Sequence, residues 1–164
     1  MSAPRPGVRS PDPGRHAELV AERNSEAVRT FLRLLEEGDI DTWITLWAED
    51  AFQFYPFGTE MFPSRIHGRR AVHERWKALP QNFTTLRFPL RELWATGDTV
   101  VARFDGDCVL TSGEPYANSY MGLFVFTPEG RIHEYWEYFD PIVAGMAFGL
   151  VDVHYRTEPE AGSS

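Results

Sequence analysis

The chain has 164 residues, enough for one domain with a substantial hydrophobic core. Its formal net charge of -8 argues against nucleic acid or an anionic membrane surface as a partner, because both attract basic patches. Hydrophobic residues make up 43% of the sequence, but no apolar run is long enough to span a membrane. Aromatic residues make up 14%, and small domains so rich in rings often line a cavity with some of them.

The sequence divides into an N-terminal arm, one domain and a tail. Residues 1–15 contain prolines and arginines but no apolar central region of a secretory signal, so a disordered arm is expected. Residues 16–156 are expected to form a single domain, followed by a flexible tail over 157–164. Cys108 is the only cysteine, which excludes an internal disulfide and a cysteine zinc cluster. A reducing, cytoplasmic location is therefore predicted.

Three helices are predicted in the first half of the chain. Apolar residues at helical spacing predict the first over 16–37, and Gly38 is a natural stop. A short second helix is expected over 41–48, and a third over 68–79, closed by Pro80. Between them, 51–57 has the composition of a strand, and 58–65 is expected to be a loop.

The second half is predicted to be strand after strand. Candidate strands cover 84–95, 100–111, 116–126 and 131–141, and turn residues separate them. Consecutive antiparallel pairing follows from those turns, and a short helix is expected over 142–150. The predicted fold class is α+β: a strongly curved antiparallel sheet wrapped by three N-terminal helices into a cone that encloses a cavity.

The last predicted strand carries the strongest chemical signal. Its alternation is expected to place Ile132, Glu134, Trp136 and Tyr138 on one face and His133, Tyr135, Glu137 and Phe139 on the other. Glu137 would then lie among aromatic rings, where burial disfavours a charged carboxylate and should raise its pKa. Two interpretations remain: a surface strand with a solvated Glu137, or a pocket wall that carries one acid/base group.

Several local motifs of catalysis are absent. The sequence contains no glycine-rich phosphate loop, no nucleophile elbow, no dinucleotide fingerprint and no H-E-x-x-H. His67 and His73 are six positions apart, which is the wrong spacing for one helical face. No metal site and no cofactor are therefore predicted. Asp105 and Asp107 share a face of one strand, where like charges usually mark a solvated edge.

Ordered motifs point to a known family. Glu37-Gly38-Asp39, Glu49-Asp50-Ala51 and Ile66-His67-Gly68-Arg69, followed by four strands, resemble the SnoaL-like branch of the nuclear transport factor 2-like superfamily, which includes ketosteroid isomerase relatives and polyketide cyclases. The stretches 118–124 and 136–141, with the His73-x-x-Trp76 helix, most resemble the phenazine-biosynthesis A/B proteins. The resemblance implies the cone-shaped fold and a homodimer, for which the outward Trp136 and Tyr138 would suit an interface.

The resemblance also implies roles for individual residues. By match of motif, His73 and Glu137 would be the acid/base groups. Ketosteroid isomerases have a carboxylate base, a tyrosine and a protonated aspartate where this chain has Tyr55, Phe31 and Gly122, so steroid isomerisation is not predicted. The arginines that the phenazine proteins carry on the second helix are also missing.

Further side chains are expected to contact a substrate. They are Tyr55, Trp47, Trp76, Asn118, Tyr120, Tyr135 and Phe139. Tyr55, Asn118 and Tyr120 could hydrogen-bond a carbonyl group. Three of the assigned residues have a structural alternative: Trp47 would be plain core, His73 an exposed helix residue, and Asn118 a polar group that satisfies the backbone.

Two functional hypotheses follow. The first is a cofactor-independent acid/base enzyme of isomerase, dehydratase or cyclase type, acting on a small hydrophobic or aromatic intermediate of a natural-product pathway. The second is a non-catalytic ligand-binding or protein-interaction module of the same fold. The burial of Glu137 and the presence of a closed pocket discriminate between them.

Overall fold

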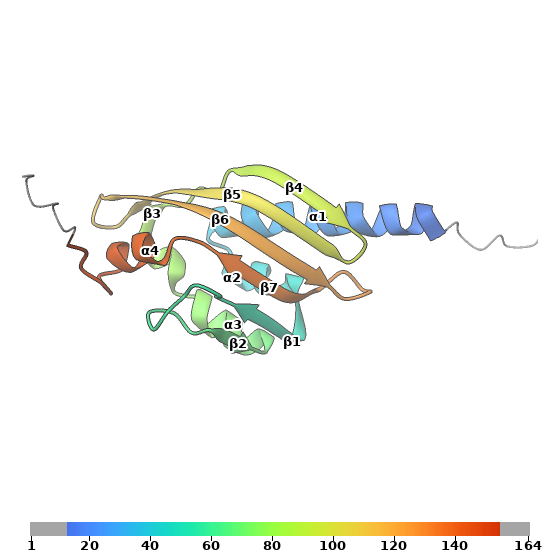
Figure 1. Cartoon of the computed structure of the whole chain (residues 1–164), viewed down its shortest axis with the longest axis horizontal. Helices are drawn as coiled ribbons and strands as arrows, with labels where there is room; N and C mark the ends of the chain where they lie inside the picture. Colours follow the sequence, from blue (N-terminus) through green and yellow to red (C-terminus); the bar gives the residue numbers. More distant parts are fainter. Residues whose placement is uncertain (1–12, 155–164) are drawn as a thin grey trace, which may run out of the picture.

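The structure is a computed structural model that describes residues 13–154 (Figure 1). Its helices are α1 (Pro13–Glu37), α2 (Ile40–Trp43), α3 (Arg69–Trp76) and α4 (Pro141–Ala147), with short 3-10 turns η1 (Ile44–Leu46) and η2 (Leu79–Asn82). Its strands are β1 (Trp47–Phe54), β2 (Arg65–His67), β3 (Phe83–Thr85), β4 (Leu90–Thr96), β5 (Thr99–Leu110), β6 (Pro115–Phe126) and β7 (Ile132–Tyr138). None of the helices in this part of the chain combines the length and apolarity needed to cross a membrane.

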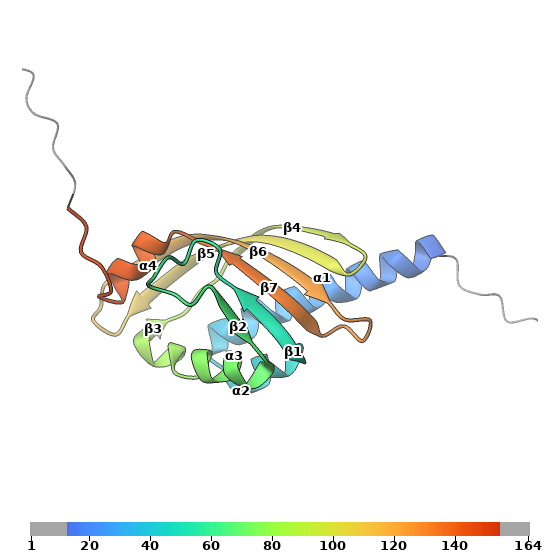
Figure 2. The same cartoon turned by 60° about the horizontal axis from the view of Figure 1, so that its bottom comes forward.

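The strands form one curled, unclosed sheet. Its order is β2-β1-β7-β6-β5-β3, and β4 also pairs with β5. The strands β4 to β7 pair consecutively and antiparallel, which confirms the expected pairing. β1 instead lies parallel to β7. In Figure 2, α1, α2 and α3 lie on one side of the curled sheet and α4 lies at one of its ends, so the predicted α+β class is confirmed.

The core fills the space between α1 and the inner face of the sheet. Val28, Phe31 and Leu35 fall on one stripe of α1 and are buried. The Phe31 ring lies 5.1 Å from the rings of both Phe124 and Tyr135, in edge-to-face arrangements. Each such buried side chain contributes about 1.5–3 kcal/mol of transfer free energy. This packing fixes β6 and β7, which carry much of the site described below.

The boundaries of several elements differ from the sequence predictions. The helix predicted over 41–48 ends at Trp43 and continues only as η1, and β1 begins already at Trp47. The reason is non-local: Trp47 pairs with Ile132 of β7. The predicted strand 84–95 is split into β3 and β4, and the predicted loop before Arg65 ends in β2.

The structure describes only part of the two chain ends for which predictions were made. Pro13 to Arg15, expected in the arm, belong to α1. The rest of that arm and the tail predicted from 157 onward lie outside the described residues.

A bulge corrects the predicted faces of β7. Val125 pairs with Glu134 while Phe126 pairs with Ile132, so β7 has one extra residue at this point. Ile132 is therefore fully buried on the inner face, contrary to the simple alternation. His133, expected on the inner face, has its Nε2 3.7 Å from Asp50 Oδ2 instead. Beyond the bulge, the expected inward positions of β7 are buried.

Candidate active site

A cavity of about 360 Å³ lies between the inner face of the sheet, α3 and α4. Its walls are mostly aromatic and aliphatic. The residues that line it are Leu35, Tyr55, Phe62, Arg75, Trp76, Ala78, Leu79, Asn82, Phe83, Phe88, Phe104, Tyr116, Tyr120, Tyr135, Glu137, Phe139, Ala144, Phe148 and Leu150. Such a volume accommodates a small organic ligand.

Glu137 is the buried carboxyl group of this cavity. It lies on β7 and is only 6% exposed. Burial raises its pKa from 4.5 to about 8, although a hydrogen bond from Gln53 and the charge of Arg75 act in the opposite direction. The predicted burial and raised pKa are confirmed, and the interpretation as a solvated surface residue is wrong. The carboxyl group is therefore mostly neutral at pH 7.

Gln53 holds the Glu137 side chain in place. Its Nε2 donates a hydrogen bond to Glu137 Oε2 over 3.2 Å. Its Oε1 accepts one from Trp76 Nε1 over 2.8 Å. Because the indole N–H occupies the amide oxygen, the amide NH₂ group must face Glu137. Gln53 is not among the residues predicted from the sequence, although it shares the inner face of β1 with Ala51 and is fully buried.

Tyrosine hydroxyls form a second polar group in the cavity. The hydroxyls of Tyr116 and Tyr120 lie 2.6 Å apart, and Asn118 Nδ2 donates to the Tyr116 oxygen over 3.1 Å. Burial raises the pKa values of Tyr55, Tyr116, Tyr120 and Tyr135, so all four phenols are protonated at neutral pH. When Tyr116 donates to Tyr120, the hydrogen of the Tyr120 hydroxyl is available to a ligand.

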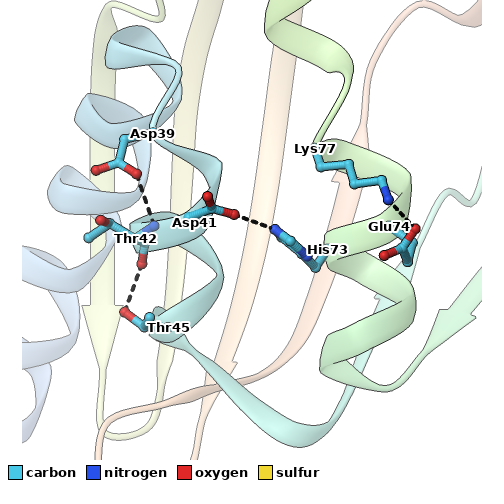
Figure 3. A network of polar contacts seen from close by, with 7 residues as sticks. All are labelled: Asp39, Asp41, Thr42, Thr45, His73, Glu74 and Lys77. Carbon is cyan, nitrogen blue, oxygen red and sulfur yellow. Dashed lines mark hydrogen bonds and ion pairs between the residues drawn. The ribbon is translucent and has the colours of Figure 1, made fainter.

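His73 does not reach the cavity. Val72 and Trp76, four residues apart, form the inward stripe of α3, and His73 projects from the side of the helix toward α2. Its Nε2 lies 2.8 Å from Asp41 Oδ1 (Figure 3). The expected placement of an imidazole opposite Glu137 is therefore not found, and the alternative of a surface residue describes its position.

Two further predicted contacts also lie elsewhere. Trp47 is fully buried among Phe31, Trp43 and Tyr135, so it belongs to the core. Asn118 accepts a hydrogen bond from the backbone N–H of Asp140 over 3.1 Å and donates to its carbonyl over 3.0 Å. It thereby fastens β6 to the start of α4, which is the structural alternative stated for it.

The other predicted contacts converge on the cavity. They are Tyr55, Trp76, Tyr120, Tyr135, Glu137 and Phe139. Arg75 also lines it and was not predicted. Within residues 13–154, no group of three or more histidines, cysteines or carboxylates could hold a metal ion. Asp105 forms an ion pair with Arg91 over 2.8 Å, outside the cavity.

Comparison with known proteins agrees with this architecture. Residues 28–135 match the model of the SnoaL-like domain. Protein YesE of Bacillus subtilis is 34% identical over 131 residues, which is 78% of this chain and 88% of the relative. A PhzA/B-like protein of Pseudomonas aeruginosa is 29% identical over 124 residues, 74% of this chain and 86% of the relative.

Solved structures show the same fold. A Bacillus subtilis protein described as "Putative Isomerase" superposes with a TM-score of 0.72 at 33% identity, over 79% of this chain and 95% of that one. An NTF2-like protein of Burkholderia pseudomallei superposes with a TM-score of 0.67 at 17% identity, over 76% of this chain and 96% of that one.

Proposed function

The chain belongs to the SnoaL-like domain family, and on that premise we propose that it is a cofactor-independent acid/base enzyme of isomerase type in which Glu137 transfers the proton. One observation carries the proposal: a carboxyl group is buried in an aromatic cavity with a pKa of about 8. A group whose pKa lies near the working pH both accepts and donates protons efficiently. The similar Bacillus subtilis structure described as a "Putative Isomerase" supports the reaction class.

The proposed reaction is a 1,3-proton shift next to a carbonyl group. The Glu137 carboxylate removes a proton from the carbon beside the carbonyl, so a C–H bond breaks, an O–H bond forms and an enolate results. The Glu137 carboxyl then returns the proton to the carbon at the far end of the conjugated system. Atoms and electrons balance within the substrate and one side chain. The Gln53 hydrogen bond keeps Glu137 Oε2 fixed throughout both steps.

Tyrosine hydroxyls are proposed to stabilise the enolate. Tyr120 and Tyr55 line the same cavity as Glu137 and stay protonated at neutral pH because burial raises their pKa values. A hydrogen bond to the oxygen on which negative charge develops is worth most in a cavity shielded from water. We expect Tyr120→Phe to lower kcat about 100- to 1000-fold, with a smaller effect on KM.

The substrate is proposed to be a small hydrophobic or aromatic carbonyl compound. The ring-lined cavity of about 360 Å³ supports this class. That the compound is an intermediate of a natural-product pathway is part of the proposal and follows only from the resemblance of the sequence motifs to the phenazine-biosynthesis proteins. We further propose a cytoplasmic homodimer. The outer face of the sheet supports the dimer, because the aromatic side chains of Phe54 and Trp136 are only partly buried there.

Turnover of β,γ-unsaturated ketones by wild type and Glu137→Gln tests the proposal. We expect the variant to lose about two to four orders of magnitude in kcat/KM. The wild-type rate should rise about tenfold per pH unit and level off above pH 8, because the carboxylate starts the reaction. Glu134→Gln is the matched control, since Glu134 bonds the Trp136 indole outside the cavity. Unchanged turnover in Glu137→Gln would refute the assignment.

One observation favours a second candidate function. At pH 7 a group with a pKa of about 8 is roughly nine-tenths neutral. A dehydratase or cyclase reaction that begins with proton donation from Glu137 would use this major form. Its rate would be flat below pH 8 and fall above it, opposite to the isomerase profile. The same pH series on hydroxy-ketone substrates therefore separates the two reactions.

A further inference from the structure

Arg75 is the cationic side chain among the described residues that line the cavity. Three other basic residues of this helix region have acidic partners in the described part of the chain, whereas Arg70 and Arg75 do not: Arg69 pairs with Glu49, His73 with Asp41 and Lys77 with Glu74. Within residues 13–154, no carboxylate forms an ion pair with Arg75. Its charge is therefore available to a group that enters the cavity.

The surroundings of Arg75 do not neutralise it. The Arg75 charge lowers the pKa of Glu137, but burial has the larger and opposite effect, so Glu137 remains mostly neutral at pH 7. The Arg75 side chain also interacts with the buried Tyr55 hydroxyl, which is uncharged at this pH. The cavity therefore combines apolar walls with a positive charge and an acidic group in its neutral form. An anionic ligand experiences attraction to Arg75 without strong repulsion from Glu137.

We propose that the cavity binds ligands in which an apolar ring system carries a carboxylate, and that Arg75 binds this carboxylate. A guanidinium group presents two parallel N–H donors that match the two oxygens of a carboxylate. The rings of Tyr55, Trp76 and Phe139 line the remaining space. The inference rests on the proposed function in one respect, because it assigns the same cavity as the substrate site. It adds the charge of the substrate.

Binding of 2-naphthoate and of 2-naphthamide, measured by isothermal titration calorimetry at pH 7, tests the proposal. The two probes have nearly the same shape and differ in charge. We expect wild type to bind the carboxylate about tenfold more tightly than the amide, since a hydrogen bond to a charged group outweighs a neutral one. Arg75→Gln should abolish this preference and leave the amide affinity unchanged.

Arg70→Gln is the matched control. Arg70 lies on α3, is exposed, does not line the cavity and forms no ion pair within the described residues. It should keep the preference for naphthoate. Equal loss in both arginine variants would assign the effect to general electrostatics and overturn the proposal. So would a wild type that prefers neither probe, or binds neither at millimolar concentration.

The Glu137→Gln variant separates this inference from the proposed reaction. It should bind naphthoate with the same preference over naphthamide as wild type, because Arg75 is intact. Lost turnover with retained selectivity supports both proposals. If Glu137→Gln retains turnover, only the role of Glu137 is refuted. If wild type shows no preference for naphthoate over naphthamide, only the anion site is refuted.

Discussion

Replacing Glu137 by Gln is expected to stabilise the protein at neutral and alkaline pH. The folded pKa of about 8 exceeds the ordinary value of 4.5, so the neutral carboxyl favours folding below pH 4.5 and this contribution is lost as pH rises to 8. Each pH unit in that window costs about 1.4 kcal/mol of the free energy of unfolding. The free energy of unfolding of wild type is therefore lower by about 3 kcal/mol at pH 7 and by about 5 kcal/mol at pH 9 than it would be with a carboxyl that stays neutral. Glutamine has a similar shape, does not titrate and can still accept the bond from Gln53 Nε2.

Urea denaturation of wild type and Glu137→Gln at pH 4, 7 and 9 measures this difference. The free energies of unfolding of the two proteins should nearly coincide at pH 4. That of Glu137→Gln should be higher by about 3 kcal/mol at pH 7 and by about 5 kcal/mol at pH 9. Glu134→Gln, on the same strand but bonded to Trp136 outside the cavity, should follow wild type at all three. A stability difference independent of pH would refute the account of Glu137 as a buried, neutral carboxyl. The same substitution is expected to remove activity, so stability and function would change in opposite directions.

Three further substitutions test other parts of the site. Trp76→Phe removes the donor to Gln53 Oε1 and should cost about 1–3 kcal/mol of the free energy of unfolding, measured in urea, because a buried oxygen loses its partner. Gly122→Ala places a Cβ 3.0 Å from Tyr135 Cε2 and should cost about 1–3 kcal/mol in the same assay. His73→Gln should leave kcat/KM within about twofold of wild type, since it breaks only the partly exposed contact between His73 Nε2 and Asp41 Oδ1.

Each of these variants has a matched control. Trp94 is half exposed, so Trp94→Phe should change stability little. Met121 neighbours Gly122 but is exposed, and Met121→Ala should likewise have a small effect. His67→Gln, the control for His73→Gln, removes a histidine that is exposed. If His73→Gln lowers turnover far more than His67→Gln does, the conclusion that His73 takes no part in the reaction is wrong.

The sequence was informative where local periodicity and burial coincide. The apolar stripe of α1 and the turns between β4, β5, β6 and β7 are local signals, and the elements follow them. Glu137 could be predicted as buried because its neighbours on the inner face are aromatic, although β7 ends at Tyr138 and not, as predicted, at Pro141.

Other features depend on contacts between distant residues. Trp47 has helical spacing to Trp43, but pairing with Ile132 draws it into β1. A bulge in β7 reverses the face of Ile132, and no turn residue marks it. His73 and Arg75 lie two residues apart on α3, and only the packing of that helix decides which of them reaches the cavity. Gln53 acquires its role from Trp76 and Glu137, neither of which is near it in sequence.

The parallel pairing of β1 with β7 has a consequence for how the protein matures. Gln53 and Glu137 are 84 positions apart, and their hydrogen bond joins the two strands across the cavity wall. During synthesis, β1 leaves the ribosome long before β7 exists, so Gln53 Nε2 then lacks its acceptor on Glu137. Contacts of such long sequence separation form slowly because a large loop must close first. The Glu137 carboxyl is thus placed late in folding, and the cavity of a nascent chain lacks one wall until β7 has docked.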